Sequence, residues 1–376
     1  MKYYIVAGEA SGDLHGSNLM RGLFSEDCNA DVRFWGGDLM AAVGGTLVHH
    51  YREGAVMGFL DVLKKARVLL DNVKSCVNDI MEWKPDVVIL IDYPGFNLKV
   101  AEKVHEAGFK VFYYIAPKVW ASREKRVESI RKYVDRLFIV FPFEIPFFEQ
   151  KGIPFIYKGN PLIDSIAAHD FRPAVESGYI ALLPGSRKGE ISRMMPVCME
   201  VADRLGCRVV IAGAPARSRE DYQKYIGDRK NVELVFGRTY DLLKYADAAI
   251  VNSGTASLET VLIGTPQVTC YSTSPLNMFL VFRVLHVERK IRFISLANLC
   301  LGRLAFKELI QKGFSKDDTL VQGEFSADEL TEEVKRLTGD QEYREAMLKD
   351  YEEIRTLLGS SGASSAVARA MIEELS

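Results

Sequence analysis

Short apolar runs alternate along the first part of the chain with longer segments whose apolar positions recur with helical period. Runs that are apolar at every position are typical of parallel strands, because helices cover both faces of such a sheet. The expected strands are residues 3–7, 32–36, 86–91, 110–115 and 136–140. The expected helices lie near residues 14–24, 58–82, 97–107 and 122–133. This alternation predicts a doubly wound α/β domain.

A second alternating series follows a segment that contains Pro173 and Gly178 and that we interpret as a linker. Its expected strands are residues 179–185, 208–214, 232–237, 248–254 and 266–271. Helices fit near residues 188–204, 216–226, 240–246 and 255–263, and the pattern is helical throughout after about residue 326. We therefore expect two Rossmann-like domains and a helical C-terminal segment that packs back on the first domain, over residues 1–165, 175–340 and 341–376 respectively.

The composition narrows the class of protein. The 376 residues carry a formal net charge of -2, so there is no basic excess of the kind that neutralises nucleic-acid phosphates. Six scattered cysteines without a CxxC pair favour reduced thiols over disulfides or a zinc site. We find no signal peptide and no apolar run long enough to span a membrane, so we expect a cytoplasmic protein.

Two loops of the second domain share the order strand, glycine with hydroxyl residues, helix. They contain Gly185, Ser186, Arg187 and Glu190 in the first case, and Ser253, Gly254 and Thr255 in the second. Backbone N–H groups at a helix start bind phosphate, and a guanidinium pairs with it, so the loops together suit a nucleoside diphosphate. Glu259, one turn inside the second helix, would bridge ribose hydroxyls. The alternative for the first loop is an ordinary turn with a solvated arginine.

Carboxylates stand at the strand ends of the first domain. Asp92 follows the most hydrophobic strand, and Glu9 follows the first strand. Partial burial raises the pKa of a carboxyl group and suits it to act as a general base. Alternatively, Asp92 caps the next helix, and Glu9 and Asp13 are a cap and a loop carboxylate. Because acidic groups repel phosphate, we expect this domain to bind a polyol acceptor, through Ser11, Gly12, Asp13 and Asn97.

A nucleotide in one Rossmann-like domain and a hydroxyl-bearing acceptor in a facing one describe a GT-B glycosyltransferase. The sequence carries, in this order, "VAGEASGD", "PKVWA", "FPFE", "LLPGSR", "NSGTASLE" and "SLANLCLGR…KELIQ". These segments together, over nearly the whole chain, resemble the lipid-A-disaccharide synthase family of bacterial lipopolysaccharide synthesis. The fold class that we expect is accordingly α/β, of the GT-B type, with two facing Rossmann-like doubly wound domains.

The resemblance implies the reaction. UDP-2,3-diacylglucosamine donates its sugar to the 6-hydroxyl of 2,3-diacylglucosamine 1-phosphate (lipid X), with inversion, to give a β-1,6-linked disaccharide 1-phosphate and UDP. Asp92 matches the family's motif aspartate and is our first choice of base, with Glu9 second. Arg187 and the two helix starts would stabilise the departing diphosphate in place of a metal, and no cofactor is expected. Asn298 and Arg303 match the family's donor-side motif, and Lys118 and Arg123 would meet the acceptor 1-phosphate.

Acylated substrates imply work at the inner face of the inner membrane. The segment 58–81 combines an apolar face with basic residues, which suits anionic lipid headgroups, although such a helix taken alone is more often a core helix. The expected membrane contacts are Leu63, Lys64, Lys65, Arg67, Val68 and Leu69. The resemblance further implies a homodimer with exchanged C-terminal parts. A second apolar and basic stretch, residues 278–293, fits a dimer interface, an acyl-chain wall or core.

Several rival classes of protein share parts of this pattern. A GT-B enzyme that adds N-acetylglucosamine to the undecaprenyl carrier of peptidoglycan has two such domains and a ribose glutamate, but its loops do not suit "GEASGD" and "DYPGFN". A sugar-nucleotide 2-epimerase shares the fold and binds no acceptor. A non-catalytic nucleotide-binding or scaffold protein would not need Asp92. An NAD-dependent oxidoreductase is disfavoured because the chain has no GxGxxG, and the P-loop class is disfavoured because it has no Walker motif.

Overall fold

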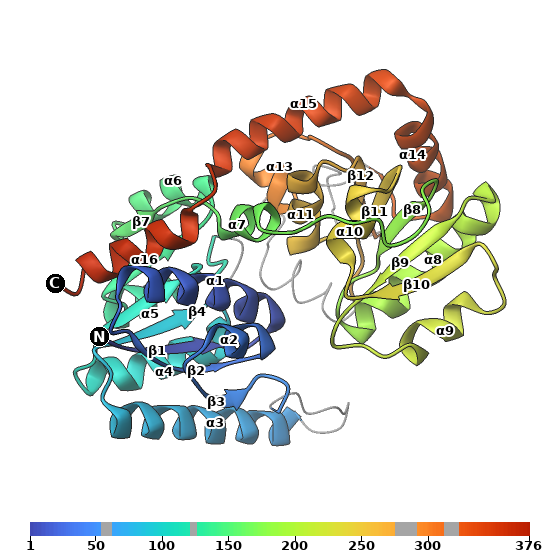
Figure 1. Ribbon diagram of the computed structural model, residues 1–376. Coiled ribbons are helices and arrows are strands. Elements are labelled where there is room, and N and C mark those ends of the chain that lie inside the picture. Colours follow the sequence, from blue (N-terminus) through green and yellow to red (C-terminus); the bar gives the residue numbers. More distant parts are fainter. Residues whose placement is uncertain (54–61, 121–125, 275–291, 312–322) are drawn as a thin grey trace. The chain divides into compact units, whose positions relative to one another are not determined.

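The computed structural model describes residues 1–53, 62–120, 126–274, 292–311 and 323–376, with residues 62–66 described by their backbone alone. These residues form two compact units. Unit 1 comprises residues 1–167 and 358–376, and unit 2 comprises residues 168–357. Each unit is a parallel sheet covered by helices, as the alternating apolar pattern predicts (Figure 1).

Unit 1 contains a seven-stranded parallel sheet in the order β3-β2-β1-β4-β5-β6-β7. Its strands are β1 (Lys2–Ala7), β2 (Asp31–Gly36), β3 (Thr46–His50), β4 (Val87–Ile91), β5 (Val111–Tyr114), β6 (Arg136–Ile139) and β7 (Phe155–Tyr157). The direction in which the strand order progresses reverses between β1 and β4, which pair from Tyr3 with Val87 to Ala7 with Ile91. Ligands of doubly wound sheets bind beyond the carboxyl ends of the strands at such a reversal.

Helices lie on both faces of this sheet. They are α1 (Ala10–Glu26), α2 (Asp38–Val43), α3 (Val62–Trp83), α4 (Pro94–Glu106), α5 (Arg126–Tyr133), the short 3₁₀ helix η1 (Pro142–Glu144), α6 (Ile145–Gln150), α7 (Pro161–Ala167) and α16 (Ala363–Glu373). Helices α1 and α16 lie side by side (Figure 1). A Cβ at Gly22 of α1 would stand 2.9 Å from the Cβ of Ala368, so a glycine is what allows the two helices to approach.

Two helix starts in unit 1 differ from the sequence prediction. Helix α1 begins at Ala10 rather than near residue 14, so most of "GEASGD" is the first turn of a helix and not a loop. Helix α4 begins at Pro94 rather than residue 97, because proline is well suited to the first turn of a helix. The first correction places Ser11, Gly12 and Asp13 in the first turn of α1, and the second makes Asn97 the fourth residue of α4.

Unit 2 contains a six-stranded parallel sheet in the order β10-β9-β8-β11-β12-β13. Its strands are β8 (Ile180–Leu183), β9 (Val209–Gly213), β10 (Val232–Phe236), β11 (Ala248–Asn252), β12 (Gln267–Tyr271) and β13 (Glu308–Ile310). Its helices are α8 (Lys188–Leu205), α9 (Glu220–Ile226), α10 (Thr239–Lys244), α11 (Thr255–Ile263), α13 (Leu296–Leu301), α14 (Ala327–Gly339) and α15 (Gln341–Leu358). The strand order reverses between β8 and β11, which pair in parallel.

The C-terminal helices divide between the units. Residues 341–357, which form all of α15 except its last residue, belong to unit 2, while α16 belongs to unit 1. The Arg355 guanidinium on α15 donates to the carbonyl oxygens of Val261 and Leu262 on α11, at 3.0 and 3.1 Å. These contacts hold α15 to unit 2, so of the residues expected to pack on the first domain, α16 lies in unit 1 and α15 lies in unit 2.

Candidate active site

The exit of β4 has a strained backbone. Asp92 and Tyr93 both have φ of 44°, in the left-handed region that non-glycine residues rarely adopt. The Tyr113 hydroxyl and the Asn97 amide nitrogen both donate to the Asp92 carbonyl oxygen, the latter at 2.9 Å. Such strain costs about 1–3 kcal/mol for each residue and persists only where surrounding contacts impose it, most often at functional sites. Asp92 is therefore held in a fixed place at the reversal of the sheet.

The exits of β1 and β4 touch each other. A Cβ at Gly8 would lie 2.2 Å from the ring of Tyr93, so this position leaves no room for any other residue. The Tyr93 ring in turn stacks on Phe96 with 5.6 Å between ring centroids. The first glycine of "GEASGD" thus serves the close approach of the tyrosine, and it brings exposed Glu9 to the same edge as Asp92.

Opposing charges act on the Asp92 carboxyl group, which is half-buried. Burial raises the pKa of Asp92 above its ordinary value, and the negative charge of Glu9 adds to that effect. The positive charges of Lys118 and Arg126 and the Tyr93 N–H act in the other direction. The sequence prediction missed Arg126, because it lies on a helix with no recognisable motif.

Asp13 does not face solvent as an acceptor-binding residue would. Its side chain is buried, and its carboxylate accepts hydrogen bonds from the backbone N–H groups of Gly37, Leu39 and Met40, at 2.9 to 3.0 Å. Asp13 therefore caps the start of α2. Gly12 is buried as well, where a Cβ would stand 3.2 Å from the Cβ of Ala7, and half-buried Ser11 occupies the first turn of α1.

The remaining acceptor-side residues have different surroundings. Asn97 is fully buried, and its amide nitrogen donates to the carbonyl oxygens of Ile91 and Asp92, so it supports the strained turn from inside. Lys118 is exposed at the exit of β5. Arg123 lies outside the described residues.

Glu144, in the "FPFE" segment, is a further carboxylate that the sequence prediction left without a role. It is 1% exposed, and it accepts hydrogen bonds from the backbone N–H groups of Val140 and Phe141 at 3.3 and 3.1 Å. Burial raises the pKa of Glu144 to about 7, against the opposing effect of these donors and of Lys118. A carboxyl group at the β6 exit therefore titrates near neutral pH.

In unit 2 the start of α8 follows β8. Gly185 has φ of 100°, and a Cβ there would lie 2.5 Å from a carboxylate oxygen of Glu190. Glu190 folds back over the helix start and accepts from the N–H groups of Ser186 and Arg187 at 3.0 and 3.2 Å. The N–H groups that we expected to bind phosphate thus already have an acceptor, whereas the side chains of Ser186 and Arg187 are exposed.

The start of α11 follows β11, the neighbour of β8 in the sheet. Gly254 is its N-cap residue, with open space around it and no side-chain cap on the helix. The Ser253 hydroxyl donates to the carbonyl oxygen of Ile294 at 3.3 Å. Half-buried Thr255 opens the helix. The uncapped N–H groups of this turn carry the positive end of the helix dipole, which suits a phosphate.

Glu259 lies on α11, one turn beyond this start. The Tyr240 hydroxyl on α10 donates to Glu259 Oε1 at 3.0 Å. Burial raises the pKa of Glu259, and the hydrogen bond from Tyr240 lowers it. Tyr240 was absent from the sequence prediction, because nothing in the chain connects it to Glu259 except the fold.

The two residues of the "NLCLGR" segment make structural contacts. Asn298 is fully buried, and its side chain donates to Phe306 O and Glu308 Oε1 and accepts from the Ala305 N–H. Arg303 is paired with Asp350 and Glu353 of α15, each at 2.7 Å. These contacts use every polar atom of the Asn298 side chain and hold Arg303, whose side chain is half exposed, against α15.

The membrane prediction falls on α3. Arg67 is exposed, Val68 is half-buried, and half-buried Leu69 packs against the core of unit 1. The side chains of Leu63, Lys64 and Lys65 lie outside the described residues, as does most of the stretch 278–293. None of the described helices is long and apolar enough to cross a membrane.

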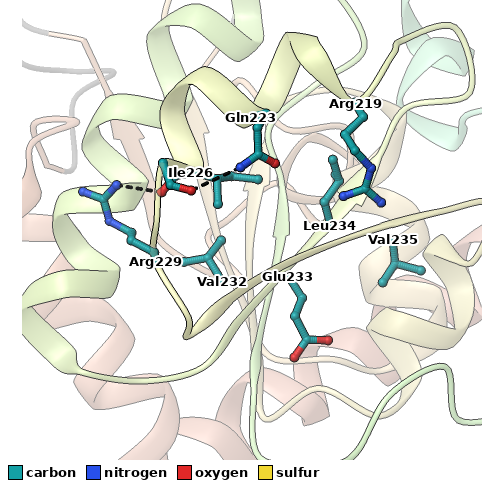
Figure 2. Close-up of a pocket in the computed structure, with 9 residues that line it drawn as sticks. Arg219, Gln223, Ile226, Arg229, Val232, Glu233, Leu234 and Val235 are labelled. Atoms are coloured by element: carbon teal, nitrogen blue, oxygen red, sulfur yellow. Dashed lines mark hydrogen bonds between the residues drawn. The ribbon is translucent and has the colours of Figure 1, made fainter.

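A cavity of about 320 Å³ lies elsewhere, between α9 and the edge strand β10 (Figure 2). Arg229 and Gln223 donate there to the carbonyl oxygens of Ile226 and Gly227 and so close the end of α9. No predicted site residue lines this cavity. In the described ranges, no cluster of three or more His, Cys, Asp or Glu residues could hold a metal ion.

Comparison with known proteins gives the family. The family model described as Lipid-A-disaccharide synthetase matches residues 3–358. The lipid-A-disaccharide synthase of Trichlorobacter lovleyi is 35% identical over 97% of this chain and 95% of its own length. The chain belongs to the lipid-A-disaccharide synthase family. The family expected from the sequence motifs is thereby confirmed, and the peptidoglycan-type, scaffold and oxidoreductase alternatives are set aside.

Solved structures confirm the fold of this lipid-A-disaccharide synthase family member. A UDP-GlcNAc 2-epimerase of Neisseria meningitidis, bound to UDP-GlcNAc, matches with a TM-score of 0.67 at 14% identity, over 99% of this chain and 100% of that one. The kitacinnamycin glycosyltransferase matches with a TM-score of 0.62 at 15% identity, over 100% and 98% of the two chains. The expected GT-B class of two Rossmann-like domains is confirmed.

Proposed function

We propose that this chain transfers 2,3-diacylglucosamine from UDP-2,3-diacylglucosamine to the 6-hydroxyl of lipid X. The products are the β-1,6-linked disaccharide 1-phosphate of lipid A synthesis and UDP. Membership of the lipid-A-disaccharide synthase family, over nearly the whole chain, supports this reaction. The chain is accordingly a glycosyltransferase that binds a sugar nucleotide.

Asp92 is the proposed general base. It would take the proton of the acceptor 6-hydroxyl as that oxygen attacks the anomeric carbon, while the bond from this carbon to the diphosphate breaks and UDP leaves. The carrying observation is the place of Asp92 directly after β4, at the reversal of the sheet, on a left-handed turn that Tyr113 and Asn97 hold. A raised pKa increases the proton affinity of this carboxylate, as a general base requires. Glu9, at the exit of the neighbouring strand β1, is the second choice.

The leaving diphosphate is assigned to unit 2. The uncapped start of α11 at Ser253, Gly254 and Thr255 offers N–H donors, and exposed Arg187 offers a guanidinium. Glu259 would accept hydrogen bonds from the ribose. The α11 start and Arg187 supply positive potential where negative charge develops on the departing UDP.

Positive charge at the β4 and β5 exits suits the acceptor 1-phosphate. The charges of Lys118 and Arg126 both act on Asp92, so they lie within electrostatic reach of the proposed base. We assign the phosphate to these two residues, together with Arg123 of the undescribed segment. Half-buried Ser11 and exposed Glu9 lie at the start of α1, where they would contact sugar hydroxyls.

Asp92→Asn tests the base. The amide keeps the size of the carboxyl group and cannot accept the proton, so we expect turnover of UDP-2,3-diacylglucosamine with lipid X to fall by about 10²–10⁴-fold, with UDP affinity unchanged. Asp86→Asn is the matched control, because Asp86 is an exposed aspartate just before the amino end of the same strand, where it accepts from the Lys2 N–H. Near-normal turnover in Asp92→Asn would move the assignment to Glu9.

We further propose that the protein acts at the inner membrane surface as a homodimer with exchanged C-terminal parts. On α3, Leu70 is 55% exposed next to exposed Arg67, an apolar and basic pair of the kind that binds anionic lipid surfaces. Sedimentation with vesicles of anionic phospholipid tests the first part, and Leu70→Asp is expected to weaken it. Equal recovery with neutral vesicles would contradict it. The mass of the protein in solution tests the dimer.

A further inference from the structure

The two oxygens of the Glu259 carboxylate have different surroundings: one bonds to the protein and the other is open to solvent. Its Oε1 accepts the Tyr240 hydroxyl at 3.0 Å. Within the described part of unit 2, no hydrogen bond reaches Oε2, and this atom is not buried. Glu259 is the fifth residue of α11, too far along the helix to fold back onto its own N–H groups. Its orientation therefore depends on the tyrosine.

Tyr240 is itself held in place. Its ring meets the ring of His169 edge to face, with 5.3 Å between the centroids. His169 is fixed by Asp241, with 3.0 Å between Nε2 and Oδ1, and Asp241 also accepts from the Arg172 N–H at 3.0 Å and from Arg238. Thus the tyrosine ring packs against a hydrogen-bonded network that joins the segment after Ala168 to α10.

We infer that Tyr240 is a positioning residue of the nucleotide site, which turns the second oxygen of Glu259 toward the ribose hydroxyls of a UDP-sugar. This inference rests on the proposed ribose contact of Glu259. One oxygen bound to the tyrosine leaves the other to accept from the substrate, so the ribose meets a preoriented acceptor. A carboxylate without the tyrosine would lose that orientation.

The tyrosine also affects the charge of Glu259. Burial raises the pKa of Glu259, and the hydrogen bond from Tyr240 is the opposing influence. Helix α13, which packs against α11, has no charged residue, and Arg355 of α15 bonds to carbonyl oxygens at the far end of α11. His169, whose ring contacts the Tyr240 ring, is paired with Asp241. Loss of the hydroxyl thus raises the pKa of Glu259 further. In Tyr240→Phe the carboxylate then takes up a proton at a higher pH than in the wild type, and UDP binding weakens at that higher pH.

The test compares the affinities of the full-length wild type and of Tyr240→Phe for UDP and 2′-deoxy-UDP, by calorimetry between pH 5.5 and 8.5. We expect the variant to bind UDP about 5- to 10-fold more weakly, to lose the preference for UDP over the deoxy analogue, and to shift its acid limb to higher pH. The matched control is Tyr245→Phe, because the Tyr245 hydroxyl donates to Phe171 O at 3.3 Å near the same helix and not to Glu259. We expect wild-type binding from this control.

The outcomes separate the two assignments. A wild type that does not distinguish UDP from 2′-deoxy-UDP would overturn the ribose contact of Glu259 itself. A wild type that does distinguish them, with Tyr240→Phe unchanged in preference and in pH profile, would overturn the inference about Tyr240 alone. Glu259→Gln, which retains an acceptor for the tyrosine and cannot titrate, serves if Tyr240→Phe does not fold. The ratio of its affinities for UDP and 2′-deoxy-UDP should not vary over this pH range, because the diphosphate titrates alike in both ligands, and a ratio that still changed with pH would overturn the inference.

Discussion

The starts of α8 and α11 form a natural pair. Both follow a central strand of the unit 2 sheet at the reversal of strand order, both contain a glycine beside serine, and both have a glutamate about one turn on. In α8 the glutamate is the third helical residue, Glu190, and it folds back to accept the N–H groups of Ser186 and Arg187. In α11 it is the fifth, Glu259, and it bonds instead to Tyr240.

A difference of two positions thus decides which helix start is open. A carboxylate at the third helical position can reach the N-cap N–H, and one at the fifth position cannot. The α8 start therefore has its own anion, and the α11 start is left for one from solution. The glycine-serine pattern alone does not distinguish these cases, because the distinction lies in the spacing of the next glutamate.

The largest effect is expected on the free energy of unfolding, when Gly185 or Gly254 is replaced by alanine. Gly185→Ala places a Cβ 2.5 Å from Glu190 at a φ of 100°, so we expect the free energy of unfolding to fall by about 2–4 kcal/mol. Gly254→Ala has open space and an extended φ of 167°, and it should cost about 0.5–1 kcal/mol as a poorer N-cap. Urea denaturation of both variants measures the difference. Equal losses would mean that the α8 start is not the more tightly built of the two.

A second prediction concerns Glu144, a capping carboxylate that is buried. Glu144 reaches back to the Phe141 N–H as Glu190 does to the Arg187 N–H, but burial raises the pKa of Glu144 from 4.5 to about 7. The native state then binds more protons than the unfolded chain between these values, so the stability from this group is present below the lower value and is lost as the pH rises through the upper one. We expect Glu144→Gln to remove a slope of up to about 1.4 kcal/mol per pH unit from the unfolding free energy.

The matched control for this slope is Glu149→Gln, since Glu149 is exposed on the neighbouring helix α6. Chemical denaturation at several pH values between 4.5 and 8 covers the window. A wild-type slope that remained in Glu144→Gln would show that another group causes it.

The smallest effect concerns nucleotide binding. Glu190→Gln removes a negative charge from the α8 start, so a diphosphate there would meet less repulsion, and UDP should bind about 2- to 5-fold more tightly. Glu200→Gln, on the same helix and remote from its start, makes the same charge change and should leave the affinity as it is. Weaker UDP binding in Glu190→Gln, measured by calorimetry, would instead place Glu190 in direct contact with the donor.

The sequence predicted the strongly apolar strands β1, β4 and β11 well, because they are buried on both faces and their pattern needs no knowledge of the fold. It missed β3 and β7, which have no buried residue, and β13, which has three residues. Such strands exist because a neighbouring strand offers hydrogen bonds, and periodicity cannot reveal this.

The site residues divide in the same way. The places of Asp92 and of the α11 start in the fold could be predicted, because both follow an evident strand of a doubly wound sheet. Asp13, Asn97 and Asn298 could not be placed correctly, since a polar side chain that bonds to backbone groups inside the protein has the same sequence signal as one that binds substrate. The contribution of Tyr240 depends on a side-chain contact between the consecutive helices α10 and α11, which only the fold brings about.

The division of the chain between the units has a consequence for synthesis on the ribosome. Unit 1 is built from two segments, and α16, which packs on α1 at Gly22 and pairs Arg369 with Glu26, comes after every residue of unit 2. As the chain grows, unit 2 can close its core while the α16-facing side of α1 is still uncovered. The domain that begins first is therefore completed last, and nascent chains carry an exposed helical face until residues 358–376 have emerged.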